Sequence, residues 1–206
     1  MLILASASPR RQELLRHAGI PFSVQPANVG EQHRRGETPE NFVLRLAREK
    51  AQAVAELTGT EHHILAADTE VVLDLAAGSP LGKPQDAEDA ARMLRLLRGH
   101  SHFVITGVCL MWKNASGNLQ WQQGAETTAV HMQHVSDQEI RDYVATGEPM
   151  DKAGSYAIQG IASRWIPRIE GCYFNVVGLP VPLVYRMLRE HAPEALPGTG
   201  NPGILK

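Results

Sequence analysis

Apolar and polar residues follow one another along this chain in two patterns, one typical of buried strands and one typical of amphipathic helices. Short apolar runs predict strands, and apolar residues that recur at helical spacing predict helices between them. We expect strands over residues 2–6, 22–27, 102–112 and 119–133, and one strand or a pair of strands over residues 63–75. We expect helices over residues 9–18, 39–58, 87–98, 137–146 and 179–191. Because strands and helices alternate, the pattern predicts an α/β fold with a mixed sheet.

Capping residues mark several of these helices. Ser8 precedes Pro9 as an N-cap, and proline suits the first helical position because its missing N–H would have no partner there. Ser136 and Glu139 have the spacing of a capping box. Polar or glycine-rich stretches predict loops over residues 28–37, 76–84 and 147–160, the last of which is too polar for a core.

The end of the chain differs in composition from the rest. Residues 193–203 are dense in proline and glycine, which predicts a loose tail. We therefore expect one domain over residues 1–192 and a tail over residues 193–206. The 206-residue length suits one domain or two small lobes that share a core.

Composition narrows the function classes. The net charge of −2 gives no bulk attraction to nucleic acid or to an anionic membrane, so any anion binding must be local. No apolar run is long enough for a spanning helix, and the N-terminus has no secretory pattern. The two cysteines, Cys109 and Cys172, are far apart and are expected to be reduced thiols. We therefore expect a cytoplasmic protein that binds neither nucleic acid nor membrane.

Two helices carry a cation on their apolar face. On a helical wheel Arg11 groups with Leu14 and Leu15 in the first helix, and Lys50 lies within the apolar arc of the second. Burial of an unpaired charge is costly, so each cation needs an anionic partner. For Arg11 that partner is either a phosphate at the helix N-terminus or a protein carboxylate, unless its guanidinium extends to water. Lys50 either meets a buried carboxylate or reaches a cleft.

A carboxylate follows the third predicted apolar run. Asp68 ends the stretch ILAAD, at a place where α/β sheets bind ligands, and its carboxylate can accept a proton or hold a divalent ion. A turn or helix cap is the ordinary role for such an aspartate. Glu31 and Lys83 lie in loops, where a solvated side chain is the default. The histidine pairs lack the spacing of a zinc site, and we reject a structural metal site.

The assembled motifs resemble the Maf family of nucleoside triphosphate pyrophosphatases over about residues 2–190. The matching stretches, in chain order, are SASPRR (6–11), Glu31, REKA (48–51), ADT (67–69), GKP (82–84), TGV (106–108), GEPMDKAGSYAIQG (147–160) and NVVGLP (175–180). The resemblance implies an elongated mixed β-sheet flanked by helices, with two lobes and a central cleft, as in inosine triphosphate pyrophosphatases. The 147–160 stretch resembles the branch that acts on dTTP and UTP.

The resemblance also implies roles for individual residues. Asp68 corresponds to the catalytic base, and Glu31 with Asp68 to positions that bind a divalent metal, Mg²⁺ or Mn²⁺. The implied substrate-binding residues are Ser8, Arg10, Arg11, Lys50, Thr69, Lys83 and Gln159. A homodimer is implied in the same way. One departure is Glu70, where the family usually has an apolar residue; its acid either pairs with a neighbouring cation or faces solvent.

Two other functions stay open at this point. The same cationic cleft would serve a nucleotide sensor without catalysis, in the control of septum formation during cell division. Acyl or phosphoryl transfer through Ser6 or Ser8 would need an adjacent base, and none is apparent nearby in the sequence.

Overall fold

The computed structural model describes residues 1–58, 62–75 and 80–197. Six strands form one sheet in the order β2-β1-β3-β4-β5-β6. The strands are β1 (Leu2–Leu4), β2 (Ser23–Val24), β3 (His63–Val72), β4 (Ser101–Lys113), β5 (Leu119–His131) and β6 (Arg168–Glu170). Strand β1 runs parallel to β2 and β3, whereas every other pairing is antiparallel. The predicted mixed sheet is confirmed.

All five predicted helices are present. They are α1 (Pro9–His17), α2 (Pro39–Thr58), α3 (Ala87–Leu97), α4 (Asp137–Ala145) and α6 (Val181–His191). Sequence analysis missed β6 and the short helix α5 (Tyr173–Val177), because segments of three and five residues are too short to show a period. It also placed the end of the third strand at residue 75, three residues beyond its last strand residue, Val72.

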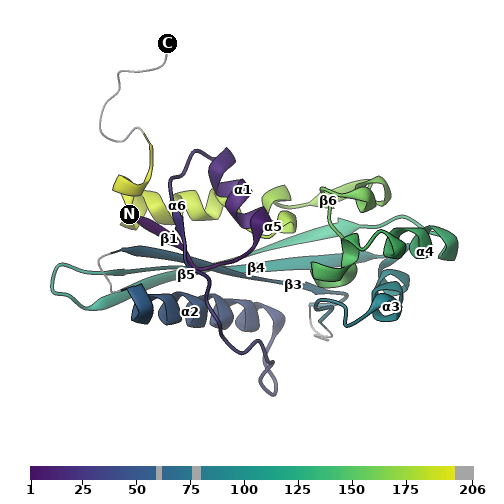
Figure 1. Ribbon diagram of the computed structural model, residues 1–206, viewed down its shortest axis with the longest axis horizontal. Coiled ribbons are helices and arrows are strands. Elements are labelled where there is room, and N and C mark those ends of the chain that lie inside the picture. Colours follow the sequence, from purple (N-terminus) through teal and green to yellow (C-terminus); the bar gives the residue numbers. More distant parts are fainter. Residues whose placement is uncertain (59–61, 76–79, 198–206) are drawn as a thin grey trace, which may run out of the picture.

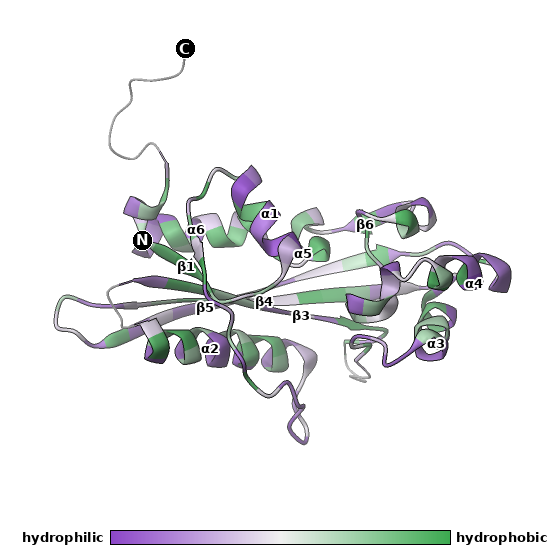
Figure 2. Cartoon of the chain, viewed as in Figure 1, coloured by the Kyte–Doolittle hydropathy of each residue, from purple (hydrophilic) through white to green (hydrophobic). Residues whose placement is uncertain are grey.

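Helices cover both faces of the long sheet. Figure 1 shows α2 beneath it, with α1, α5 and α6 on the opposite face. The apolar side of α2 faces the strands, as the colours of Figure 2 show. At Gly107 of β4 a Cβ atom would lie 2.5 Å from the backbone oxygen of Val43, so glycine is needed for α2 to pack this closely. The predicted helix-flanked, elongated sheet is therefore confirmed.

Two clusters of buried side chains lie toward the two ends of the sheet, and two smaller clusters pack between α2 and the strands. One end is filled from β1, α1 and α6, with Leu4, Leu15 and Leu188 at its centre. The other end, near α3 and α4, is built around Leu94 and Trp165. The division of the domain into two lobes stays a prediction.

Two segments expected to be loose contain buried residues. In the 147–160 loop, Gly154, Ser155 and Tyr156 are buried, so the expectation that this stretch is too polar for the core was wrong for them. The Ser155 hydroxyl contacts Met93 Sδ at 3.2 Å, and Tyr156 packs with the cluster around Trp165. At the chain end, Ala195 and Leu196 are buried because their apolar side chains join the core near α6. The rest of the predicted tail, residues 198–206, and part of the predicted 76–84 loop lie outside the described residues.

Strand β1 leaves half of β3 open on one side. Leu2–Leu4 pair with His63–Leu65, and the N–H of Ala5 donates to the carbonyl of Leu65 at 2.8 Å. The chain then departs into α1, so the strand edge from Ala66 to Glu70 has no strand neighbour on that side among the described residues. Side chains from both faces of β3 can therefore reach one space at this edge. In the described ranges, no helix is both long and apolar enough to cross a membrane.

Candidate active site

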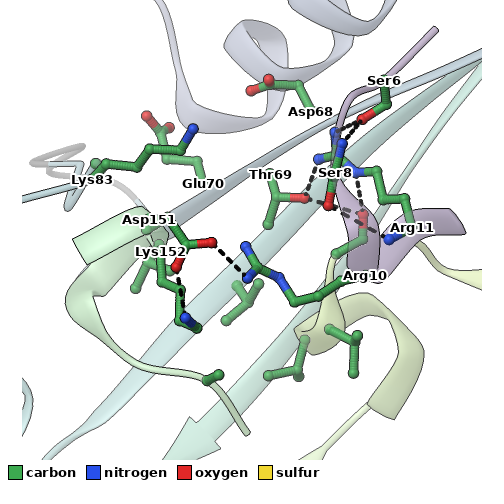
Figure 3. A pocket seen from close by; sticks show the side chains of 18 of the residues that line it. Ser6, Ser8, Arg10, Arg11, Asp68, Thr69, Glu70, Lys83, Asp151 and Lys152 are labelled. Atoms are coloured by element: carbon green, nitrogen blue, oxygen red, sulfur yellow. Dashed lines mark hydrogen bonds and ion pairs between the residues drawn. The ribbon is translucent and has the colours of Figure 1, made fainter. Parts of the chain in front are cut away.

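A cavity of about 630 Å³ lies at the open edge of β3. Asp68 and Glu70 reach it from one face of the strand and Thr69 from the other, because successive strand residues point to opposite faces. The cavity is also lined by the remaining residues that the sequence marked, namely Ser8, Arg10, Arg11, Glu31, Lys50, Lys83 and Gln159. Figure 3 shows Ser8, Arg10, Arg11 and Lys83 among them. The structure therefore brings together every side chain that was predicted to bind substrate or metal or to act as the base.

Arg11 is held by neutral oxygens. Its guanidinium donates to the carbonyl of Gly178 at 2.8 Å, to Ser6 Oγ at 3.2 Å and to Thr69 Oγ1 at 3.0 Å. The expectation of a protein carboxylate as one possible direct partner was wrong within the described residues. Burial lowers the pKa of Arg11, and the nearby Asp68 carboxylate opposes that effect. The guanidinium is thus fixed in place while its charge stays available to an anion.

The start of α1 supports this arrangement. Ser8 is its N-cap and accepts a hydrogen bond from the backbone N–H of Arg11 at 3.5 Å. The backbone N–H of Ser8 donates to Ser6 Oγ at 3.2 Å, which orients that hydroxyl beside Arg11. The first turn of a helix has unpaired N–H groups and the positive end of the dipole, both favourable to a phosphate.

Lys50 joins two carboxylates. Its Nζ lies 2.6 Å from Asp68 Oδ1 and 2.6 Å from Glu31 Oε1. The lysine within the apolar arc therefore meets a buried carboxylate and also reaches the cavity, so both predicted outcomes hold. For Asp68, burial outweighs the charges of Lys50 and Arg11 and raises the pKa of its carboxyl group. For Glu31, partial burial is outweighed by the hydrogen bond and charge of Lys50, so the pKa is lowered.

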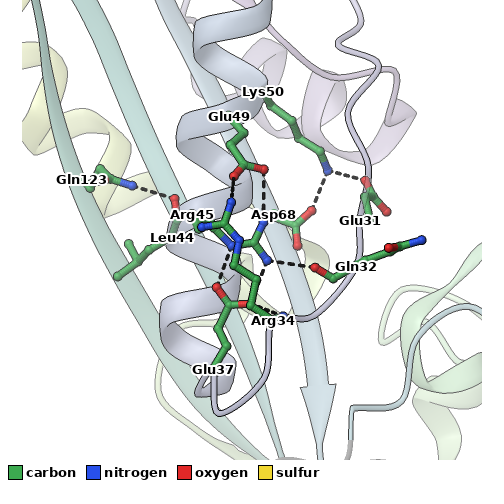
Figure 4. A network of polar contacts seen from close by, with 10 residues as sticks. All are labelled: Glu31, Gln32, Arg34, Glu37, Leu44, Arg45, Glu49, Lys50, Asp68 and Gln123. Atoms are coloured by element: carbon green, nitrogen blue, oxygen red, sulfur yellow. Dashed lines mark hydrogen bonds and ion pairs between the residues drawn. The ribbon is translucent and has the colours of Figure 1, made fainter.

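A network on α2 holds the loop that carries Glu31. Arg45 donates to both carboxylate oxygens of Glu37, at 2.6 and 2.7 Å, and to the carbonyl of Gln32 at 3.0 Å. Arg45 also reaches Glu49 on the next turn of the helix, which in turn receives a hydrogen bond from Arg34 (Figure 4). The loop is thereby tied to α2, the helix that also presents Lys50.

The remaining predicted cations line the cavity differently. Arg10 Nη1 lies 3.2 Å from Asp151 Oδ2, and Lys152 Nζ lies 2.6 Å from the other oxygen of the same carboxylate. Lys83 is exposed and makes no ion pair with any described residue. Gln159 is also exposed at the cavity, with no hydrogen bond from its amide to the described part of the chain. These last two side chains are free to meet a ligand.

Glu70 is buried, so the solvent-facing alternative was wrong. Its Oε1 lies 2.6 Å from His33 Nε2, and the His33 ring stacks on Phe42 with centroids 3.6 Å apart. Its Oε2 is buried and has no hydrogen-bond partner among the described residues. Burial raises the pKa of Glu70, against the opposing influence of His33. The acid thus pairs with a neighbouring imidazole.

Sequence reasoning missed several cavity residues. Asp151, Lys152 and Tyr156 lie within the stretch 147–160 that carried the resemblance, but only Gln159 was singled out there. His33 is one of nine histidines and lies in a polar loop, where no pattern distinguishes it. The carbonyl of Gly178 contributes through its backbone, which a side-chain pattern does not reveal.

The fold and the cavity define an α/β protein that places a partly desolvated carboxylate among cations suited to a polyanion. The chain belongs to the family described as Maf-like protein, which matches residues 1–191. It is 55% identical over 188 residues to a dTTP/UTP pyrophosphatase of Koribacter versatilis, covering 91% of this chain and 93% of that protein. It is 50% identical over 186 residues to a dTTP/UTP pyrophosphatase of Syntrophomonas wolfei, covering 90% of this chain and 94% of that protein.

A solved structure is also similar. It is the nucleoside-triphosphatase / dITP/XTP pyrophosphatase of Mycobacterium abscessus, at a TM-score of 0.39 and 18% identity. The similarity covers 63% of this chain and 73% of that chain.

Proposed function

We propose that this protein hydrolyses dTTP and UTP to the nucleoside monophosphate and pyrophosphate. The observation that carries the proposal is the position of Asp68, a buried carboxylate that faces the same cavity as Arg10, Arg11 and Lys83. The two relatives above are both named dTTP/UTP pyrophosphatase, and the match covers more than nine-tenths of each of them. They support this substrate class.

The cations would bind and orient the triphosphate. Arg11 has a fixed planar fork suited to paired phosphate oxygens, and Lys83 adds a compact charge from the opposite loop. The N-terminus of α1 after Ser8 offers backbone N–H groups to the same anion. Phosphoryl transfer depends mainly on such positioning and on stabilisation of developing charge.

Asp68 would act as the general base. Its carboxylate would orient a water molecule and accept its proton while the water attacks the α-phosphorus in line with the leaving pyrophosphate. Burial raises the pKa of Asp68, which makes the carboxylate a stronger proton acceptor. Lys50, hydrogen-bonded to Oδ1, would hold the carboxylate in position and limit that rise.

A divalent metal ion, Mg²⁺ or Mn²⁺, fits the donors at this place. Lys50 contacts one oxygen each of Glu31 and Asp68, and the second oxygen of each accepts no hydrogen bond within the described ranges. Carboxylate oxygens suit these ions, and Mg²⁺ commonly takes one or two of them together with substrate phosphates. Phosphate oxygens of the nucleotide would supply the remaining ligands. When bound, the ion would neutralise phosphate charge.

The charge balance of the cavity gives an independent reason for the ion. Four acidic side chains line it, and five cationic side chains face them: Arg10, Arg11, Lys50, Lys83 and Lys152. A triphosphate therefore brings more negative charge than the protein alone can offset. Glu31 and Asp68 would hold the additional cation beside the phosphates.

Gln159 would read the base. Its amide carries both donor and acceptor groups, and the edge of a pyrimidine presents the same two kinds of group. The side chain is exposed at the cavity and is free of other hydrogen bonds within the described chain. The choice between dTTP, UTP and modified pyrimidine nucleotides would then depend on this contact.

A nucleotide panel tests the proposal. Pyrophosphate release is measured for the common and modified nucleoside triphosphates, with and without Mg²⁺ or Mn²⁺, on wild type and on Gln159→Glu. We expect turnover of dTTP and UTP that needs the metal and is lost or redirected in Gln159→Glu. Binding without release of a monophosphate would instead support the sensor. A cytoplasmic location and a homodimer stay predictions.

A further inference from the structure

The Glu148 side chain joins the two ends of the loop that carries Gln159. Its Oε1 accepts a hydrogen bond from the hydroxyl of Tyr143 at 3.0 Å and from the backbone N–H of Ile161 at 3.1 Å. Its Oε2 lies 3.2 Å from the same N–H of Ile161. Glu148 and Ile161 are the two ends of the segment that contributes Asp151, Lys152, Tyr156 and Gln159 to the cavity, yet Glu148 itself does not line the cavity.

Gly160 makes this closure possible. A Cβ atom there would lie 2.0 Å from Glu148 Oε1, so any other residue would displace the carboxylate. The φ of Gly160 is −103°, which other residues also adopt, and the requirement is therefore one of space. Because Gly160 follows Gln159 directly, the carboxylate fixes the backbone immediately next to the base-reading side chain.

Tyr143, which donates its hydroxyl hydrogen bond to Glu148, is held firmly in the fold. Tyr143 is buried in α4, and its ring packs edge-on against Trp165 with centroids 5.1 Å apart. A complete capping box fixes the start of α4. Gln159 has no hydrogen bond of its own among the described residues, so its position depends on the backbone that Glu148 holds.

We propose that Glu148 is a positioning residue for nucleobase choice, acting through Gly160 to set where Gln159 stands in the cavity. This inference rests on the proposed function. The class of ligand that it selects is a nucleoside triphosphate whose pyrimidine carries a carbonyl at C4, as in UTP and dTTP, over the aminopyrimidine of CTP. Discrimination needs Gln159 to meet the base edge in one orientation, and a small displacement weakens that discrimination more than it weakens phosphate binding.

Two substitutions separate the effect of the length of the Glu148 side chain from the effect of its charge. Glu148→Gln keeps the length of the side chain, and its amide oxygen can still accept from Tyr143 and Ile161. Glu148→Asp keeps the charge but is one methylene shorter. We expect Glu148→Asp to lower the UTP:CTP ratio of kcat/KM by about 10- to 100-fold, and Glu148→Gln to keep it within about fivefold. The control is Asp142→Asn, an exposed change on the same helix whose carboxylate accepts from Gln138, outside the capping box and away from the cavity; it should leave the ratio unchanged.

A double-mutant cycle tests the route through Gly160. Gly160→Ala lowers the ratio in the wild-type background, because its Cβ displaces the carboxylate. In Glu148→Ala, which has no carboxylate to displace, the same change has little further effect. Thermal melts identify any variant that fails to fold, and Glu148→Asp and Glu148→Gln still decide the question in that case.

The measurements also separate this inference from the proposed function. Calorimetry also gives the dissociation constants of the α,β-imido analogues of UTP and CTP. Their ratio measures base discrimination in binding alone. Wild-type protein that binds but does not hydrolyse would overturn the proposed activity, and the binding ratio would still test Glu148. An unchanged ratio in Glu148→Asp, or additive effects in the cycle, would overturn the role of Glu148. Wild-type protein that binds neither analogue would overturn both.

Discussion

Lys50 Nζ donates to Asp68 Oδ1 over 2.6 Å, between side chains that are only 11% and 10% exposed. Burial of either charge alone would be costly, so each is tolerated because of the other. Glu31 meets the same ammonium from the solvent side, with 55% of its side chain exposed. These three side chains link helix α2, strand β3 and the loop before α2 at Asp68, the proposed general base.

Asp68→Asn should lower pyrophosphate release by about 10²- to 10⁴-fold, because an amide cannot take the proton of the attacking water. The amide oxygen can still accept from Lys50, so the fold should be retained, as circular dichroism and thermal melts would check. Asp142→Asn, an exposed change on α4, serves as the control. Full turnover in Asp68→Asn would contradict the role of general base.

Lys50→Met should move the acidic limb of the kcat/KM profile to higher pH. Asp68 acts only when ionised, and the charge of Lys50 lowers the pKa that burial raises. Removing that charge leaves burial less opposed, so the pKa of Asp68 rises further and activity is lost at a higher pH on acidification. A profile measured from pH 5 to 9 checks the direction. Unchanged kinetics together with lower thermal stability would mean that Lys50 is only structural.

Arg11→Lys should lower the free energy of unfolding by about 2 kcal/mol and raise the KM for nucleotide. A lysine cannot reproduce the three directed hydrogen bonds to Gly178, Ser6 and Thr69. The matched control is Arg16→Lys on the same helix, whose hydrogen bond to Gln12 is exposed. Urea unfolding and steady-state kinetics measure the two effects. Equal behaviour of the two variants would contradict the placement of Arg11 as a fixed phosphate ligand.

The contribution of His102 to stability should fall by about 3 kcal/mol as the pH decreases from about 6.5 to 4. Burial, with a smaller effect of His131, lowers the pKa of His102 from 6.5 to about 4. The unfolded chain therefore binds a proton in this range before the folded protein does, so acid favours unfolding and the contribution is complete above pH 6.5. Urea unfolding at several pH values measures the slope.

His102→Gln tests the source of that slope. Gln can still hydrogen-bond to Tyr156, whose hydroxyl lies 2.7 Å from His102 Nε2, but it does not titrate. The slope between pH 4 and 6.5 should therefore flatten in this variant and persist in His134→Gln, a change at an exposed histidine. A slope that is the same in all three proteins would place the titration elsewhere.

Local sequence signals were sufficient for the main elements of the fold. The caps at Ser8 and Ser136 each accept the hydrogen bond that their position predicts, because an N-cap acts within a single turn. The short segments β6 and α5 escaped prediction because tertiary pairing, and not their own periodicity, makes them regular. Ala195 and Leu196 were assigned to a tail because the glycines and prolines that follow dominate the composition.

The candidate site was predictable in its residues but not in its contacts. An arginine or lysine on an apolar helix face indicates a buried partner, as it did for Arg11 and Lys50. The kind of partner was undetermined: Arg11 meets two hydroxyls and a carbonyl, whereas Lys50 meets two carboxylates. Gly178 lies 167 positions from Arg11, and no local pattern relates residues at that separation.

By itself, the sequence determined the longer helices and strands, which side chains carry charge into apolar surroundings, and the family to which the chain belongs. Only the tertiary structure decided that β1 ends early beside β3 and leaves an edge open to both faces of the strand. It also decided that Glu70 turns inward to His33 and that Glu148 closes the loop before Ile161. The reason is physical: capping and periodicity act over a few residues, whereas strand pairing and ion pairing join residues that only folding brings together.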